Sequence, residues 1–420
     1  MIKILKRAKA AKISMAQLTS EQKNEILLNF AEKINKYSDK IIEANKKDIV
    51  IARQKNMSEA LIDRLALNEK RIQGMIDAIH EIIAQDDPIN KVIEQFPIKA
   101  GPIVSKVSVP LGVVLIIYES RPNVFVDSAA LCIKSSNVSV LRGSSSAIYS
   151  NSCLNSIIKE TLKELEIDEN IVNFIEDTDR KLVDSLVKAR EYIDVLIPRG
   201  GKGLKQYIYE TATIPIIETG DGICHIFVDE SAKSDMARDV LVNAKTQRPG
   251  TCNSCETVLF HKNLDINTIA NITDALLNKN VEIRYQKDII ESLKSINYNN
   301  VDKLIEAQDS DFGFEFHDMI IAGRYIDNVD LAIDFINAHS TKHSESIISE
   351  NKTNADKFLL LVDSAVVYHN ASTRFTDGGE FGFGGEIGIS TQMLHARGPM
   401  ALKELTTYKY NVRGKGDVRK

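Results

Sequence analysis

The chain has 420 residues, of which 43% are hydrophobic and 26% are charged. Its length predicts two or three structural units in one globular chain. The 53 basic and 58 acidic residues give a formal net charge of −5. This balance, without a basic stripe, argues against a nucleic-acid partner. No apolar run approaches the roughly 20 residues of a membrane span, and no secretory signal opens the chain, so we expect no membrane association.

The cysteines are five in number, which is odd and sparse for this length. A disulfide scaffold is therefore not expected, and a reducing compartment, the cytoplasm, is predicted.

The N-terminal part of the chain has helical patterns. Thr19 and Gln22 have the spacing of a capping box, and apolar residues follow them on one helical face. A second amphipathic run begins near Asn68 and is closed by the pair Asp87-Pro88. A turn at 100–102 then separates two β-prone pieces. Helices followed by two short strands are therefore expected here.

Strand and helix patterns alternate through the rest of the chain. Residues 111–118 are a continuous apolar run, typical of a strand that is buried on both faces. The other expected strands are 138–141, 194–197, 224–229, 257–261, 319–326, 346–349, 365–369 and the β-prone 406–412. The expected helices between them are 126–134, 151–165, 265–277, 330–337 and 354–361. This alternation predicts an α/β fold with two doubly wound units and parallel sheets.

The loop around Cys252 is the most informative stretch. Cys252 follows a Pro-Gly turn and precedes an expected strand, and loops between rigid elements present nucleophiles. Lys245 and Arg248 are cations that would lower a thiol pKa. The residues alone leave open that Cys252 and Cys255 are small buried hydrophobic side chains. A zinc site lacks further ligands at matching spacing, and a redox Cys pair would open a helix, so we expect neither.

Three further segments place polar or glycine residues at expected strand ends. Glu218 stands before two glycines and is a candidate base or cofactor contact, or a solvated turn residue. The backbone amides of Gly200 and Gly201 could face a phosphate. Arg142 puts a cation at the end of a strand.

Several segments, in their order along the chain, are shared with one known superfamily. They are Tyr118-Glu-Ser-Arg-Pro-Asn123, Pro198-Arg-Gly-Gly-Lys-Gly203, Ile217-Glu-Thr-Gly220, Asn243-Ala-Lys-Thr-Gln-Arg-Pro249 with Thr251-Cys-Asn253, Asn370-Ala-Ser-Thr-Arg-Phe-Thr-Asp377, Glu386-Ile-Gly-Ile-Ser-Thr391 and Leu394-His-Ala-Arg-Gly-Pro399. The chain thereby resembles the aldehyde dehydrogenase superfamily and, within it, the gamma-glutamyl phosphate reductase family. The resemblance implies an aldehyde dehydrogenase-like fold with two doubly wound α/β domains and a small β arm.

The resemblance also implies the division of the chain. Residues 1–95 and 111–220 would form the nicotinamide cofactor-binding domain, and 221–393 the catalytic domain. Residues 96–110 and 394–420 would form an oligomerisation arm, so a homo-oligomer is expected. An association with glutamate 5-kinase, the preceding enzyme, stays open.

The implied reaction is the NADPH-dependent reduction of L-glutamyl 5-phosphate to L-glutamate 5-semialdehyde, with release of phosphate, in proline biosynthesis from glutamate. It would proceed through a thioester on a cysteine. The alternative is a hydrolytic NAD(P)-dependent aldehyde dehydrogenase. Residues 144–147 read Ser-Ser-Ser-Ala where the family commonly has Gly-Lys-Glu-Ala, so the choice of NADPH over NADH stays open.

The resemblance assigns site residues by position. Cys252, not Cys255, falls at the nucleophile. Glu218 falls where oxidising relatives keep a general base, and we expect it to be held away from water or to serve the cofactor. The remaining candidates are Asn123 for the oxyanion, Arg121 and Arg248 for the substrate phosphate or carboxylate, and Arg142, Gly200, Gly201 and Asp318 for the cofactor.

Overall fold

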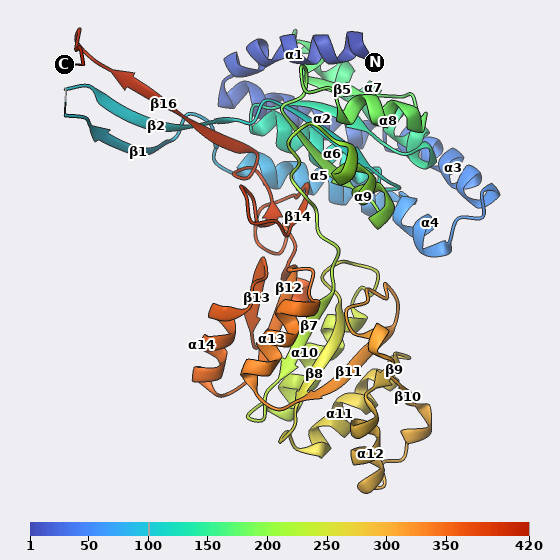
Figure 1. Cartoon of the computed structure of the whole chain (residues 1–420). Helices are drawn as coiled ribbons and strands as arrows, with labels where there is room; N and C mark the ends of the chain where they lie inside the picture. Colours follow the sequence, from blue (N-terminus) through green and yellow to red (C-terminus); the bar gives the residue numbers. More distant parts are fainter. Residues whose placement is uncertain (100, 420) are drawn as a thin grey trace. The chain divides into compact units, whose positions relative to one another are not determined.

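The computed structural model describes residues 1–99 and 101–419, and contacts divide the chain into two compact units. Unit 1 comprises Met1–Thr219, Phe381–Gly388 and Pro399–Lys420, and unit 2 comprises Gly220–Glu380 and Ile389–Gly398. Each unit has a parallel sheet with helices packed on it, which confirms the predicted α/β class (Figure 1). Over the described ranges, no helix is long and apolar enough to cross a membrane.

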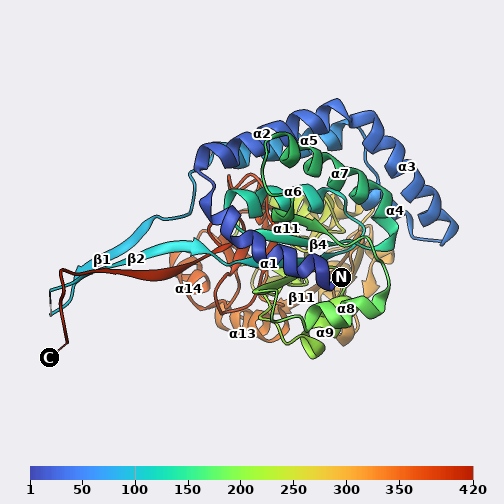
Figure 2. The same cartoon turned by 90° about the horizontal axis from the view of Figure 1, so that it is seen from above.

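The N-terminal part of unit 1 is helical, and the two helices that the sequence predicts after Thr19 and near Asn68 begin there. They are α1 (Ile2–Gln17), α2 (Ser20–Lys36), α3 (Ser38–Gln54), α4 (Glu59–Leu65) and α5 (Glu69–Ala84). The capping box of α2 is confirmed, because the Thr19 hydroxyl accepts from the Gln22 amide at 3.2 Å and the Gln22 side chain accepts from the Thr19 amide at 3.0 Å. Figure 2 shows α2 and α5 lying side by side along the outer side of this unit.

The parallel sheet of unit 1 has the strand order β5-β4-β3-β6. Its strands are β3 (Val113–Tyr118), β4 (Val138–Arg142), β5 (Val172–Phe174) and β6 (Val195–Arg199). The helices that connect them are α6 (Asn123–Lys134), α7 (Ile148–Glu164), α8 (Arg180–Val187) and α9 (Lys202–Thr211). All six residues of β3 are buried, as the continuous apolar run predicts. We did not predict β5, which has only three residues.

The arm of unit 1 is an antiparallel sheet of β1 (Val92–Pro97), β2 (Ile103–Pro110) and β16 (Thr406–Arg413), in the order β1-β2-β16. The C-terminal strand is confirmed, and it adds to β2 within the same chain. These strands run beyond the helices of unit 1 as a narrow ribbon (Figures 1 and 2). The turn predicted at 100–102 lies partly outside the described residues, because Ala100 is not described.

The sheet of unit 2 has seven parallel strands in the order β10-β9-β11-β8-β7-β12-β13. They are β7 (Cys224–Val228), β8 (Cys255–His261), β9 (Glu282–Tyr285), β10 (Ile305–Glu306), β11 (Ile320–Ile326), β12 (Ser344–Ile348) and β13 (Val366–His369). The five strands predicted here are confirmed to within two residues at each end. The sequence did not predict β9 and β10, which are short and lie at one margin of the sheet.

Helices cover both faces of this sheet. They are α10 (Ser234–Thr246), α11 (Ile266–Leu277), α12 (Lys287–Ser295), α13 (Val329–His339) and α14 (Lys352–Leu361). Ile226 and Val258 pack with α10, α11 and α12, whereas their neighbours Phe227 and Leu259 pack with α13 and α14. This alternation of side chains between two helical layers is what a doubly wound sheet requires.

The remaining elements of the two units are short. A two-stranded sheet is formed by β14 (Gly388–Ser390) and β15 (Gly398–Met400). The 3-10 turns are Ser145–Ala147, Glu169–Ile171, Val301–Lys303, Asp309–Asp311 and Thr373–Phe375.

Candidate functional site

Cys252 lies at the amino-terminal edge of the sheet in unit 2. It occupies a turn between the end of α10 at Thr246 and the start of β8 at Cys255. Because β7 and β8 are parallel, their first residues are neighbours, and Cys224 pairs with Cys255. The side chain of Cys252 is half-buried. The turn thus presents a partly accessible thiol at the strand starts.

The carbonyl group of Cys252 is fixed by the segment that leads into β7. The Cys224 thiol donates to this carbonyl oxygen across 3.2 Å. Gly222 packs against the same oxygen so closely that a Cβ atom on Gly222 would lie 1.4 Å from it. The Gly222 amide in turn donates to Glu315 Oε1 at 2.9 Å. Only glycine fits at this position, and its approach orients the peptide group of Cys252.

The two neighbouring cysteines are fully enclosed. Cys224 and Cys255 have no exposed surface, and burial raises the thiol pKa of each far above its ordinary value. Because a thiol reacts as the thiolate, both are expected to be inert at neutral pH. Among these three cysteines, the geometry therefore favours Cys252 as the nucleophile.

A buried ion pair supports the start of β8. Lys245 Nζ lies 2.7 Å from Glu256 Oε2, and both side chains are completely buried. Burial raises the pKa of Glu256 to about 7, and the opposing charge of Lys245 limits the rise. A register shift leaves Glu256 without a partner in β7, as at a β-bulge. Our expectation that Lys245 acts on the Cys252 thiol is not supported, because its ammonium group pairs with Glu256.

Residues from a distant segment enclose the residue after Cys252. The Asn253 side chain donates to the Thr376 carbonyl at 2.9 Å, and the Thr373 hydroxyl donates to the Asn253 carbonyl at 2.7 Å. Arg374 donates to Asn253 Oδ1 through Nη1 and to Gln247 Oε1 through Nε, the latter at 2.7 Å. The sequence marked 370–377 only as a shared segment, without a role for Arg374.

Two guanidinium groups affect the charge of this loop. Burial and the nearby charge of Arg248 lower the pKa of Arg374. The charges of Asp377 and Cys252 raise that pKa. Arg248 is exposed and Arg374 is half-buried. Arg248 on the loop and Arg374 beside it are therefore within electrostatic reach of each other, and Arg374 is also within reach of Cys252.

The predicted cofactor residues of unit 1 gather at the carboxyl-terminal edge of its sheet. Arg142 ends β4, is 7% exposed and donates to the Thr178 carbonyl at 3.0 Å. Gly200 and Gly201 follow β6, and β3 lies between these two strands. The Gly201 amide donates to Glu119 Oε2 at 2.8 Å, and a Cβ on Gly200 would lie 2.6 Å from the same oxygen. The sequence had not identified Glu119.

The remaining candidates lie near these two edges. Asn123 begins α6 after β3, and its side-chain amide donates to Asp127 at 3.1 Å; Arg121 lies just before it. Glu218 is half-buried in a segment that runs beside β6, where the Ile217 amide donates to the Leu196 carbonyl at 2.9 Å. Asp318 is exposed and precedes β11, at the same edge of unit 2 as Cys252.

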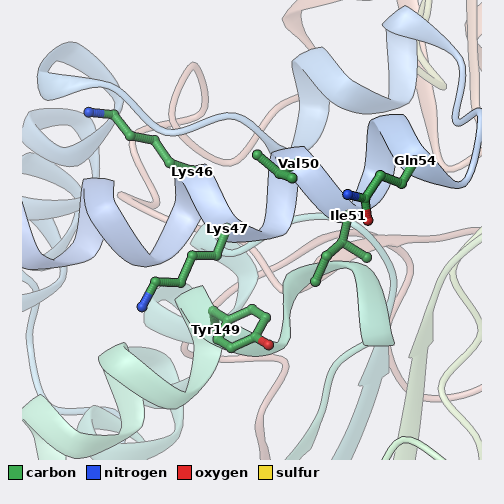
Figure 3. Close-up of a pocket in the computed structure, with 6 residues that line it drawn as sticks. All are labelled: Lys46, Lys47, Val50, Ile51, Gln54 and Tyr149. Carbon is green, nitrogen blue, oxygen red and sulfur yellow. The ribbon is translucent and has the colours of Figure 1, made fainter.

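Two hollows of the described surface are lined by residues other than the predicted ones. One, of about 360 Å³, is lined by α3 and by Tyr149, with Lys47 Nζ 5.9 Å from the Tyr149 ring centroid (Figure 3). Another, of about 530 Å³, lies along α10 and α11 and includes Gln247, the partner of Arg374. Within the described part of the chain, no cluster of three or more His, Cys, Asp or Glu residues suits a metal ion.

Sequence comparison finds one family throughout. The model of the aldehyde dehydrogenase family matches residues 1–308. Gamma-glutamyl phosphate reductase of Caldanaerobacter subterraneus subsp. tengcongensis is 48% identical over 418 residues, which cover 99% of this chain and 98% of the relative. The enzyme of the same name from Thermotoga maritima is 47% identical over 422 residues and covers both chains completely.

Structure comparison agrees. The crystal structure of gamma-glutamyl phosphate reductase from Thermotoga maritima has a TM-score of 0.94 at 46% identity and covers 100% of this chain and 99% of that chain. A propionaldehyde dehydrogenase from Rhodopseudomonas palustris, with bound CoA and an acylated cysteine, has a TM-score of 0.70 at 15% identity, covering 98% of this chain and 97% of that one. At that identity the likeness concerns the fold alone.

Proposed function

The chain belongs to the gamma-glutamyl phosphate reductase family and to the wider aldehyde dehydrogenase family, and we propose that it reduces L-glutamyl 5-phosphate to L-glutamate 5-semialdehyde with release of phosphate. It is an oxidoreductase of proline biosynthesis that acts on the aldehyde group of a small molecule. The hydrolytic aldehyde dehydrogenase alternative is not favoured, because relatives at 46–49% identity over the full length bear the name of the reductase.

The proposed nucleophile is Cys252. Its thiolate attacks the acyl carbon, a carbon–sulfur bond forms, and phosphate leaves with the electron pair of the broken carbon–oxygen bond. The thioester is then reduced to a thiohemiacetal, which releases the aldehyde and restores the thiolate. The observation that carries this proposal is the half-buried thiol of Cys252 beside two fully buried cysteines.

The developing oxyanion needs fixed donors. We assign the backbone amide of Cys252 and the side-chain amide of Asn123 to this task. Gly222 and the Cys224 thiol contact the Cys252 carbonyl and so restrict the Cys252–Asn253 peptide, which adjoins the peptide that carries the Cys252 amide and thereby supports the first assignment. Arg121 and Arg248 are proposed to bind the anionic groups of the substrate.

Membership of the aldehyde dehydrogenase family implies a nicotinamide cofactor. When bound, this cofactor supplies the hydride for the reduction. We propose NADPH, held by Arg142, Gly200, Gly201, Glu218 and Asp318. Two features of unit 1 suit a nicotinamide cofactor. One is the buried guanidinium group of Arg142 at a strand end, and the other is a Gly-Gly turn before a ten-residue helix, whose N-terminal amides are free to bind a phosphate.

The roles of the chain segments follow from this assignment. We propose that 1–95 and 111–220 bind the cofactor, that 221–393 carry the nucleophile, and that 96–110 and 394–420 form an oligomerisation arm. Tyr410 and Val412 on β16 are each more than half exposed, which supports burial of the arm against another copy. A cytoplasmic homo-oligomer is proposed, with association with glutamate 5-kinase as a further hypothesis.

The decisive assay is oxidation of the semialdehyde with and without inorganic phosphate, with NADP and NAD side by side. We expect nicotinamide reduction to require phosphate and to be faster with NADP. Cys252→Ser should abolish turnover, whereas Cys255→Ser should retain most of it, and an acyl adduct on Cys252 should be found by mass spectrometry. Equal loss in both variants, or turnover independent of phosphate, would refute the proposal. Loss of a large hydrolase activity in Glu218→Gln would overturn the passive role of Glu218.

A further inference from the structure

The partners of Arg374 suit a second task besides fixing the nucleophile loop. Its Nη1 donates to Asn253 and its Nε donates to Gln247, so two of its nitrogen atoms hold amide oxygens of the loop that carries Cys252. A guanidinium group has five N–H donors in a rigid fork. The contacts with Asn253 and Gln247 are both to neutral oxygens. The loop thus holds the guanidinium group of Arg374 in place through neutral acceptors. Arg374 takes part in none of the salt bridges found among the described residues.

A second cation lies within electrostatic reach. Arg248 directly follows Gln247, the residue that accepts from Arg374 Nε at 2.7 Å. Burial and Arg248 disfavour the charged state of Arg374, and the Asp377 carboxylate favours it. Holding two guanidinium groups near each other in a folded protein costs free energy unless an anion lies close by. Asp377 offsets only one of the two positive charges, so a net positive charge remains, which suits an anionic ligand.

The position of Arg374 relative to the Cys252 sulfur indicates which anionic group of the substrate it binds. In an acyl phosphate the phosphorus is two bonds from the carbon that Cys252 attacks. The α-carboxylate of a glutamyl substrate is four carbon–carbon bonds from the same carbon. An arginine that holds the side chain next to Cys252 is therefore placed for the group nearest the reacting carbon.

We propose that Arg374 and Arg248 together form the site for the leaving phosphate of the acyl phosphate, with Arg374 as the residue that Asn253 and Gln247 hold in position. This inference rests on the proposed function and names the residues that bind one part of its substrate. Two guanidinium groups neutralise the charge that grows on the phosphate as the carbon–oxygen bond breaks. In the reverse direction, the same pair binds inorganic phosphate.

The kinetic test uses semialdehyde oxidation with the full-length enzyme. Arg374→Gln should raise the KM for inorganic phosphate by about tenfold to a hundredfold, because charge-assisted hydrogen bonds are lost. The KM for the semialdehyde should stay within about twofold. A rise in the semialdehyde KM alone would assign Arg374 to the carboxylate and overturn the proposal. Equal rises in both would mean that Arg374 only supports the loop, which also overturns it.

A second measurement does not depend on turnover. The rate of alkylation of Cys252 is compared for iodoacetate, which is anionic, and iodoacetamide, which is neutral. Arg374→Gln should lower the ratio of the two rates by about fivefold, the effect of one nearby charge, whereas Arg374→Lys should preserve it. An unchanged ratio in Arg374→Gln would refute an anion site beside Cys252. If the wild type shows no phosphate-dependent turnover, the proposed function fails, and this ratio still decides the role of Arg374.

Two matched controls separate charge from architecture. Lys262→Gln removes a cation just after β8, roughly 20 Å from Cys255 by the rise of a seven-residue strand, and should change neither the phosphate KM nor the ratio. Gln247→Ala removes one acceptor of Arg374 and should have a smaller effect than Arg374→Gln. Should the glutamine variant fail to fold, Arg374→Lys carries the test, since loss of the fork must still raise the phosphate KM.

Discussion

The two units place their candidate residues at opposite edges of parallel sheets. In unit 1 the residues follow the carboxyl ends of β3, β4 and β6, where α6, α7 and α9 begin. In unit 2 Cys252 precedes β8, at the edge where α10, α11, α13 and α14 end. Helix N-termini offer free amides and a partial positive charge, whereas helix C-termini offer carbonyls and a partial negative charge.

This difference explains the choice of residues at each edge. At the carboxyl edge of unit 1, glycine amides at the start of α9 can hold an anion with few charged side chains. At the amino edge of unit 2, the backbone repels anions, so an anionic substrate needs side-chain cations such as Arg248 and Arg374. The same sheet architecture therefore requires different chemistry at its two ends.

The largest expected effect concerns the buried pair under the amino edge of unit 2. Above pH 7, Lys245→Met leaves the ionised Glu256 carboxylate buried and uncompensated, so we expect a loss of about 3–5 kcal/mol in the free energy of unfolding. The double variant Lys245→Met/Glu256→Leu should recover most of this loss. Urea denaturation measures both, and equal destabilisation by the single and double changes would contradict the ion-pair explanation.

The same pair gives a pH dependence. The folded pKa of Glu256, about 7, exceeds its ordinary value of 4.5, so the folded state binds the proton more tightly. The contribution of this carboxyl to stability is therefore greatest below pH 4.5 and is lost as the pH rises to 7. The stability of the wild type relative to the double variant should fall across that window.

The next effect tests the close approach at the nucleophile. Gly222→Ala places a methyl group against the Cys252 carbonyl oxygen, and the loop must move. We expect kcat/KM to fall by about a hundredfold, or about 2.7 kcal/mol. Gly74→Ala is the matched control, since it lies in the exposed middle of α5 with open space around it and should stabilise the fold slightly. Wild-type activity in Gly222→Ala would show that the peptide plane is not critical.

A smaller effect is expected at the carboxyl edge of unit 2, to which we assign a structural role and no part in the reaction. Asp229 is fully buried there and accepts from the hydroxyls of Ser349 at 2.6 Å and Ser231 at 2.8 Å. Asp229→Ala should lower the free energy of unfolding by about 2 kcal/mol through lost charge-assisted hydrogen bonds. The value of kcat/KM should remain unchanged, and a selective loss of activity without loss of stability would place function at this edge too.

Much of this arrangement could be predicted from local sequence, because local signals determine it. The unbroken apolar run of β3, the capping box at Thr19 and the alternation of strands and helices each depend on neighbouring residues. The loop position of Cys252 follows from the strand that begins three residues later. These features require no knowledge of distant contacts.

The rest depends on contacts that spacing does not reveal. Arg374 meets Asn253 across 121 positions of sequence, and Glu119 meets Gly201 across 82. The bulge at Glu256 redirects Lys245 from the thiol to a carboxylate, and a register shift leaves no local signature. The strands β9 and β10 are too short for a periodic pattern, and their pairing with β11 or with each other determines them.

The smallest expected effect tests the carboxyl edge of unit 1. The Glu119 carboxylate accepts the Gly201 amide at the start of α9, which is where we propose that a cofactor phosphate binds. An incoming phosphate that uses this amide must displace the carboxylate. Glu119→Gln should therefore lower the Kd for NADPH by about twofold to fivefold, while the cofactor-free protein loses about 0.3–1 kcal/mol of stability.

The direction of the change in the Kd for NADPH shows whether Glu119 competes with the cofactor phosphate or binds the cofactor. If Glu119 instead binds the cofactor, through a ribose hydroxyl for example, the substitution should raise the Kd. Glu210→Gln is the matched control, since Glu210 lies near the other end of α9 and accepts from the Gln206 side chain at 2.9 Å. Fluorescence titration with NADPH at two salt concentrations measures the change, and the gain in affinity should shrink at high salt, because it arises from removal of a charge at a helix N-terminus.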